Sequence, residues 1–339
     1  MTVGPLMLSP SVAEVRVVIS GFWESRRAVT AGARATGGSC HETIKTRSAA
    51  ATALNMPINI QAMKRPLLSV SVVVIALWAG VNATAQSQEA LVALDRYLET
   101  WNSRDPAVWA TSLHFPHVRP GPGAFEMTRT PSEYAAGVDF EQTLKTGWHH
   151  SEWVSREVLQ VSAEKVHAAG AWQRYTEDGR ALAGSAITYI VTKRENRWGV
   201  QARFAAGVTG LDAPAAARNA AAALDAVNAF MKAWNSHDPK TLAGTLHYPQ
   251  VRMGDGLVEI WKTADEFLAG PEPGRQRTWY QTRLDQSKAV QVTANGVNVT
   301  VSFSRLGRDG RVLSTDAGVF LVVLRDGTWK LQARSVMGP

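Results

Sequence analysis

One segment of this sequence occurs twice. The stretch "TWNSRDPAVWATSLHFPHVR" begins at Thr100, and "AWNSHDPKTLAGTLHYPQVR" begins at Ala233. Residues 101–137 align with 234–270 without a gap at an offset of 133, and 18 of the 37 aligned positions are identical. After a two-residue change in loop length, residues 148–207 align with 279–338. Chance does not produce such identity, so the chain contains a duplicated domain of roughly 120 residues.

The duplication sets the predicted domain boundaries. Between the copies, "GVTGLDAPAAARNAA" is rich in Gly and Ala and reads as a short linker that runs into a helix. We therefore place the first domain at 86–211 and the second at 212–339.

The segment 63–85 has the pattern of a secretory signal peptide. Lys64 and Arg65 form a basic start, a mostly apolar run follows, and Ala83-Thr84-Ala85 is a small-x-small cleavage site. The apolar run, about 15 residues, falls short of the roughly 20 that a spanning helix needs. We expect a periplasmic or secreted protein with no stable membrane anchor after processing.

Residues 1–62 precede this signal and show no sustained period. We expect them to be either a misassigned upstream segment, with translation starting at Met63, or a disordered extension. They contain Cys40, the only cysteine. The mature protein would then lack cysteine, and an oxidising compartment would matter little to its stability.

The net charge of +7 comes mostly from residues 1–85, because residues 86–339 hold 28 Lys and Arg against 26 Asp and Glu. Without a basic cluster, we expect no nucleic-acid partner.

Each copy has the same predicted order of elements. A helix with an apolar face ends near Asn102, and Asp105-Pro106 starts a second short helix as N-cap and first helical residue. A glycine-containing hairpin, a third helix opened by the capping box of Thr130 and Glu133, and four long strands follow. This order predicts an α+β fold: a strongly curved antiparallel sheet wrapped around about three N-terminal helices, forming a cone with a cavity.

These motifs resemble the nuclear transport factor 2-like superfamily, in particular its bacterial SnoaL-like members. The resemblance rests on "WNSRDP" and "WNSHDP", "LHFPHVR" and "LHYPQVR", the capped third helix and the endings "WGVQAR" and "WKLQAR". It implies two tandem cone-shaped domains over residues 88–339. Because this fold hosts isomerases, lyases and non-catalytic binding modules, it implies no particular activity. No catalytic aspartate and tyrosine pair like that of ketosteroid isomerases can be matched.

The repeated histidines His114 and His247 are the first candidate site residues. Each lies between a helix and the first strand, where it can serve as general base or hydrogen-bond donor at the cavity mouth. The alternative is structural: the ring bonds a backbone group and fixes the turn before the following proline. Structural histidines outnumber catalytic ones, so we favour this alternative, with His114 the candidate base if the protein is an enzyme.

The other candidates come from both copies. Three further histidines, His117, His149 and His150, occur only in the first copy. They make the first cavity the richer candidate for binding or catalysis. Three charged positions are repeated in both copies: Arg119 with Arg252, Arg203 with Arg334, and Glu126 with Glu259. In the simpler interpretation, these arginines and glutamates pair with one another across the sheet. Adjacent histidines point to opposite strand faces and no Cys or Asp stands at ligand spacing, so we expect no metal and no cofactor. The predicted ligand-binding residues are His114, His117, Arg119, Trp148, His150, Arg203, His247, Arg252, Trp279 and Arg334.

The sequence thus predicts an exported tandem protein that binds a small, partly apolar molecule in its first cone. Two alternatives stay open. One is an isomerase or lyase with His114 as base, and the other is a non-catalytic protein-interaction module. We further expect the two domains to pair as an intramolecular pseudo-dimer, because the short linker raises their effective concentration.

Overall fold

The structure, a computed structural model, describes residues 69–122, 124–207, 210–254, 256–270 and 279–337. All of them belong to the unit Arg65–Pro339. The predictions for residues 1–62, for Cys40 and for the start of the signal peptide lie outside the described residues. The domain boundaries stay predictions.

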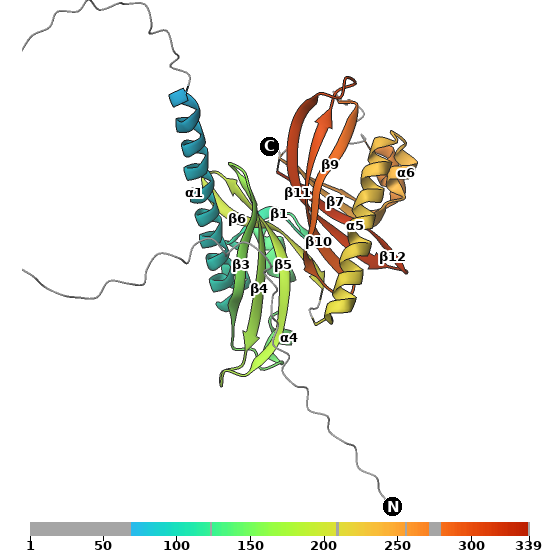
Figure 1. Cartoon of the computed structure of the whole chain (residues 1–339). Helices are drawn as coiled ribbons and strands as arrows, with labels where there is room; N and C mark the ends of the chain where they lie inside the picture. The colour runs from blue at the N-terminus through green and yellow to red at the C-terminus, as the bar shows by residue number, and fades with distance from the viewer. Residues whose placement is uncertain (1–68, 123, 208–209, 255, 271–278, 338–339) are drawn as a thin grey trace, which may run out of the picture. The chain divides into compact units, whose positions relative to one another are not determined.

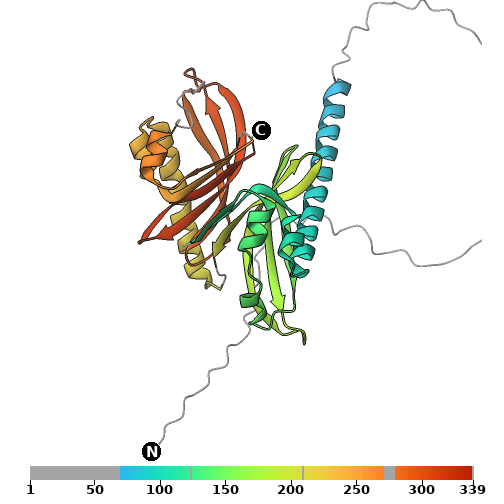
Figure 2. The same ribbon diagram turned by 180° about the vertical axis from the view of Figure 1, so that it is seen from behind.

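The first copy begins with helices and ends with four long strands. Helices α2 and α3 pack on each other, and α3 lies beside β2 (Figure 2). The elements are α1 (Ser69–Asn102), α2 (Pro106–Ala110), β1 (Leu113–Gly121), β2 (Ala124–Thr128), α3 (Pro131–Gly137), α4 (Glu141–Leu144), β3 (His150–Val161), β4 (Lys165–Tyr175), β5 (Ala181–Arg194) and β6 (Arg197–Gly207) (Figure 1).

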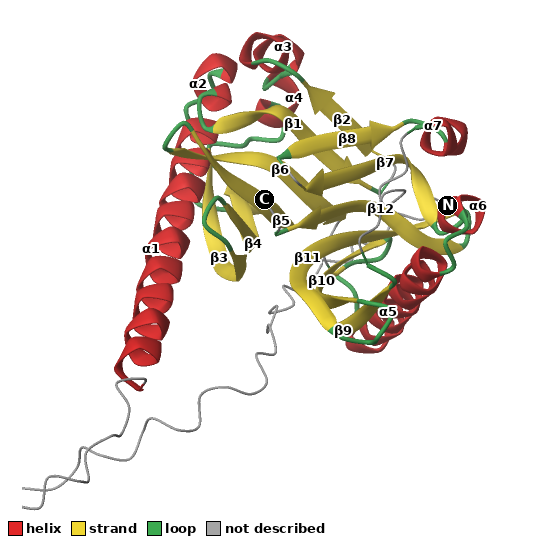
Figure 3. Ribbon diagram, turned by 90° about the horizontal axis from the view of Figure 1, so that it is seen from above, coloured by secondary structure: helices red, strands yellow, loops and turns green. Residues whose placement is uncertain are grey.

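The second copy repeats this order. Helix α5 packs against β9 and β12, as α1 packs against β3 and β6 (Figure 3). The elements are α5 (Ala213–Asn235), α6 (Pro239–Ala243), β7 (Leu246–Gly254), β8 (Leu257–Trp261), α7 (Ala264–Ala269), β9 (Gln281–Val292), β10 (Gly296–Leu306), β11 (Val312–Arg325) and β12 (Thr328–Val336).

Each copy forms one six-stranded sheet, with the orders β2-β1-β6-β5-β4-β3 and β8-β7-β12-β11-β10-β9. The predicted α+β fold of two tandem domains is confirmed. The sheets are mixed, however, since β1 with β6 and β7 with β12 are parallel pairs. The reason is the connection: helical segments separate the hairpin from the meander, so the last strand returns beside the first strand in the same direction.

The predicted helix boundaries are confirmed. Asp105 accepts hydrogen bonds from the N–H groups of Ala107 and Val108, with Pro106 at the first helical position. Thr130 accepts from the N–H of Glu133, whose carboxylate accepts from the N–H of Arg129. No sequence pattern predicts helix α4, because it has four residues and no side-chain cap.

The predicted apolar faces of the long helices are buried. Leu94, Tyr97 and Leu98 on α1 are at most 8% exposed, as are Val227 and Phe230 on α5. Helix α1 starts earlier than expected and runs without a break through the predicted cleavage site. No described helix is long and apolar enough to cross a membrane.

One buried apolar cluster contains side chains from both sheets. Several members occupy equivalent positions in the aligned copies, such as Val118 with Val251 and Ala202 with Ala333. The members are Val118, Ile190, Ala202, Phe204 and Ala206 from the first copy and Val251, Met253, Val319, Leu321, Val323 and Ala333 from the second.

Candidate functional site

The first copy contains a cavity of about 920 Å³ between its helices and its sheet. This volume is at the upper end of the range for small-molecule pockets. Aromatic side chains and three arginines form much of its lining. The lining residues that matter below are Tyr97, Trp109, Tyr134 and Trp172, together with Arg119, Arg174 and Arg203, the acidic residues Glu126 and Asp139, and Thr128 and Ser185.

Arg203 on β6 is the most buried charged group of this lining, with 7% of its surface exposed. Its Nη1 donates a hydrogen bond to the hydroxyl of Tyr97. The guanidinium carbon lies 5.6 Å from the ring centre of Tyr97 and 5.3 Å from that of Trp109. Among the described residues, Nε and Nη2 have no hydrogen-bond partner. Arg203 is therefore held between two aromatic rings, with part of its donor capacity unused.

The surroundings of Arg203 keep it charged. Burial lowers the pKa of Arg203, but the phenol groups of Tyr97, Tyr134 and Tyr189 together with Glu126 raise it by more, so the net pKa lies above the ordinary value. Burial in turn raises the pKa of the Tyr134 and Tyr189 hydroxyls. These tyrosines are thus neutral hydrogen-bonding groups at physiological pH.

Two further arginines line the cavity. Arg119 on β1 pairs with Glu126 on β2, its cross-strand neighbour, at 2.6 Å. This is the cross-strand pairing predicted from the sequence. Arg174 on β4 lies over the rings of Trp101 and Trp172, at 5.5 and 5.0 Å from their centres.

His114 does not belong to the described cavity lining. It is 4% exposed, and its Nδ1 lies 2.9 Å from the Thr192 hydroxyl on β5. Burial, with Arg197 and Arg194, lowers the pKa of His114 to about 4. In the second copy, the equivalent His247 donates a hydrogen bond from Nε2 to the Thr328 carbonyl at 3.1 Å. Both contacts fit the structural interpretation.

His117 lies beside the cavity rather than in its lining. The ring is 1% exposed, and Nδ1 donates to the Val200 carbonyl at 3.1 Å. Its ring centre is 5.5 Å from that of Tyr134, which does line the cavity. Burial, with Arg203 and Arg119, lowers the pKa of His117 well below its ordinary value. It is a neutral supporting residue behind the wall.

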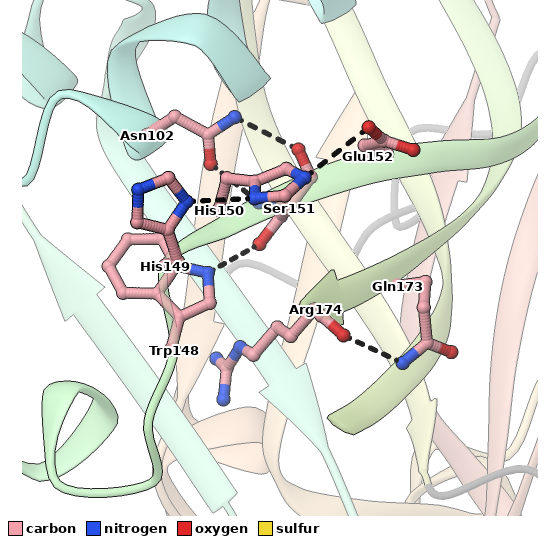
Figure 4. Close-up of polar contacts among 8 residues, drawn as sticks. All are labelled: Asn102, Trp148, His149, His150, Ser151, Glu152, Gln173 and Arg174. Carbon is pink, nitrogen blue, oxygen red and sulfur yellow. Dashed lines mark hydrogen bonds and ion pairs between the residues drawn. The ribbon is translucent and has the colours of Figure 1, made fainter. Parts of the chain in front are cut away.

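Trp148 and His150 are not among the residues that line the cavity, and Figure 4 shows their polar contacts. Trp148 donates from Nε1 to the Ser151 hydroxyl at 3.0 Å. The imidazole of His150 lies between His149, at 3.1 Å from Nδ1 to Nδ1, and Glu152, at 3.3 Å. No group of three or more potential metal ligands occurs among the described residues.

The second copy replaces the polar aromatic groups around its arginine. Aligned with Tyr97, Trp109, Tyr134 and Tyr189 are Phe230, Leu242, Phe267 and Phe320. Arg334, equivalent to Arg203, lies over the rings of Phe230 and Trp234 at 5.2 and 5.5 Å. Burial, with Arg252, lowers the pKa of Arg334 to about 9, the opposite direction to Arg203.

One position of the second copy has a larger side chain than its equivalent in the first copy. Trp261, aligned with Thr128, is 8% exposed and packs edge-on against Phe267 at 5.2 Å. Arg252 pairs with Glu259, and the guanidinium of Arg305 lies over Trp279, 4.5 Å from its ring centre. These described contacts of Arg252 and Trp279, two of the predicted ligand-binding residues, are made within the second copy.

Residues 88–206 match the protein family described as NTF2-like protein (DUF6841). This match covers the first copy, whose fold and cavity are described above. The first copy is thus an NTF2-like domain. The second copy shares the sequence repeat and the strand order of the first. No curated protein matches the chain significantly.

The solved structures that resemble this chain cover about a third of it. A putative calcium/calmodulin dependent protein kinase II association domain from Xanthomonas campestris is 15% identical and covers 36% of this chain and 87% of its own, with a TM-score of 0.29. An NTF-2 like protein from Shewanella oneidensis MR-1 is 12% identical over 34% and 95%, with a TM-score of 0.28. A ketosteroid isomerase-like protein from Erwinia carotovora atroseptica SCRI1043 is 20% identical over 36% and 98%, also at 0.28.

Sequence reasoning identified Arg119 and Arg203 in the cavity of the first NTF2-like copy but missed its aromatic wall. A signal was present in the alignment of the copies. Three tyrosines of the first copy are phenylalanines in the second, at positions that share the buried face of helix or strand. The loss of a hydroxyl at each position indicates that the first copy has polar groups at positions where the second is apolar.

Proposed function

We propose that the first NTF2-like copy binds a small, partly apolar molecule in its cavity. The observation that supports this most is the contrast between the copies. One fold has about 920 Å³ of space edged by tyrosine, tryptophan and arginine, while its duplicate places Trp261 and three phenylalanines at the equivalent positions. Aromatic walls with a few fixed polar groups are typical of small-molecule sites.

The enzyme alternative has less support. An isomerase or lyase needs a base beside the substrate, and the predicted base was His114. That imidazole is bonded to Thr192 and lies outside the described lining, and its pKa of about 4 makes it a weak base. His114, His150 and Arg203 do not converge on one cavity.

Filling the cavity is expected to abolish binding. The change Thr128→Trp copies Trp261, a residue that this fold already accommodates in the second copy. For the neutral fluorophore N-phenyl-1-naphthylamine we expect a dissociation constant of about 10 µM, from ordinary ligand efficiencies. Fluorescence titration of the wild type and of Thr128→Trp measures the effect, and we expect at least a ten-fold loss.

Tyr280→Trp is the control for the cavity variant, because it adds a tryptophan at a position that is 49% exposed. It should bind the fluorophore as the wild type does. Equal binding by the wild type and Thr128→Trp would contradict the proposed site.

We propose further that the protein is exported and that the mature chain starts at Gln86. The residues of the predicted cleavage site, Ala83–Ala85, are exposed, and Ala90 is the first buried residue in the part of α1 whose side chains are described, 83–102. Cleavage would therefore remove none of the described core contacts. N-terminal sequencing of the protein from the periplasmic fraction should return Gln86, and a chain that keeps Met63 in that fraction would contradict this.

We also propose that the two NTF2-like copies pair as an intramolecular pseudo-dimer. The shared apolar cluster supports this, and so do hydrogen bonds from Asn298 to the Phe204 carbonyl at 2.8 Å and from Thr293 to the Ala206 carbonyl at 2.7 Å. The backbones approach so closely that a Cβ at Gly296 would lie 2.2 Å from the Ala206 oxygen. Only glycine fits there.

A further inference from the structure

We propose that the ligand of the first cavity is an anion, a carboxylate on an apolar body, and that Arg203 and Arg174 bind its charged group. The inference rests on the proposed function, because it specifies the chemistry of the molecule that the cavity takes. It draws on the charges of the lining, on the second copy and on the hydrogen-bonding groups around Arg203.

The lining has an excess of positive charge. Of its three arginines, Arg119 is neutralised by Glu126. Within the described part of the chain, no carboxylate lies within ion-pair distance of Arg174 or Arg203. A buried guanidinium without a counter-charge is costly. An anion in the adjoining space would offset that cost, whereas a cation would add to it.

The second copy carries a carboxylate where the first has none. Arg305 is the equivalent of Arg174, and Asp316 is the equivalent of Ser185, which lines the first cavity. Asp316 lies 4.0 Å from Arg305. The second copy thus supplies its own counter-ion from β11. In the first copy, the carboxylate of a ligand would occupy the equivalent place beside Arg174.

The uncharged polar groups of the lining agree with an anionic ligand. Trp109 Nε1 is donor-only, and the Tyr134 hydroxyl is protonated; both are buried and have no partner among the described residues. A cationic ligand would need a carboxylate in the lining that is not paired with an arginine. Asp139 is such a carboxylate, but its Oδ1 already accepts a hydrogen bond from the N–H of Glu141 at 2.7 Å. Donors therefore predominate over unused acceptors at the cavity wall.

The test compares 2-naphthoate with 2-naphthamide, which share one ring system and differ in charge. Isothermal titration of the full chain should give at least ten-fold tighter binding of 2-naphthoate, since charge-assisted hydrogen bonds to arginine are the stronger ones. Equal affinity of the two probes would overturn this inference and leave the proposed function standing. Failure of both probes to bind would count against the proposed function, and with it against the inference.

Substitutions of the two arginines test whether they bind the charged group of the ligand. Arg203→Met should remove the preference for 2-naphthoate while 2-naphthamide still binds. Arg174→Gln, at a partly exposed and tolerant position, should reduce the preference two- to five-fold. The matched change Arg305→Gln in the second copy should leave it unaltered. A preference that survives both first-copy changes would overturn the assignment, and the comparison of the two probes on the wild type decides the matter even if Arg203→Met does not fold.

Discussion

At pH 5 the protein is expected to be several kcal/mol less stable than at pH 7.5. The cause is a set of histidines buried in the neutral form. Burial, with Arg197 and Arg194, lowers the pKa of His114 to about 4, and burial, with Lys165, lowers that of His167 to about 3. Burial, with Arg203 and Arg119, also lowers the pKa of His117 well below 6.5.

The direction follows from proton binding. Below pH 6.5 the unfolded histidines take up protons, whereas the folded ones do so only near pH 4 for His114 and pH 3 for His167. Stability is therefore complete above pH 6.5 and falls as the pH drops through this window. At pH 5 His114 and His167 each lower the free energy of unfolding by about 2 kcal/mol, so the two together lower it by about 4 kcal/mol, and His117 acts in the same direction. Urea denaturation between pH 7.5 and pH 5 measures the change.

Single substitutions separate the contributions. His167→Gln should reduce the slope of the unfolding free energy against pH by the equivalent of about one proton, and so should His114→Gln. This holds even if each substitution lowers stability at pH 7.5. A free energy of unfolding that is constant from pH 7.5 to pH 5 would contradict the neutral burial of these rings.

The fold was predictable because the repeat encodes local chemistry that tertiary packing did not override. Asp105-Pro106 and the Thr130 capping box fix helix ends through hydrogen bonds between near neighbours, so the sequence alone reveals them. The parallel pairing of β1 with β6 joins residues about 85 positions apart, Leu113 with Val200 and Val118 with Ala202. No local pattern specifies such a contact.

The site was harder to predict because the faces of β1 do not alternate strictly. The register shifts between Leu113 and Val118, and the burial along the strand is irregular. His114 and Arg119 were predicted together at the cavity, although only Arg119 lines it. The repeated histidine is conspicuous in the sequence, while the pattern of one copy alone does not distinguish Tyr97 and Tyr134 from core residues.

The change Phe204→Ala is expected to destabilise both copies, by about 4 kcal/mol in total. Phe204 is 0% exposed and belongs to the cluster that contains side chains of both sheets, and its carbonyl accepts from Asn298 of the second copy. The truncation leaves a cavity in packing that the two copies share. Hydrogen exchange read by mass spectrometry should therefore show faster exchange in β10 and β11 as well as in β5 and β6.

Val200→Ala supplies the contrast from the same strand. Val200 is also 0% exposed, but its cluster contains only side chains of the first copy. Its truncation should speed exchange in the first copy and leave β10 and β11 protected, because their packing does not include it. If Phe204→Ala loosens the first copy alone, the two copies are independent domains on one chain. Faster exchange in the second copy with Phe204→Ala, and not with Val200→Ala, is the outcome expected of a pseudo-dimer whose halves stabilise each other across equivalent faces of their sheets.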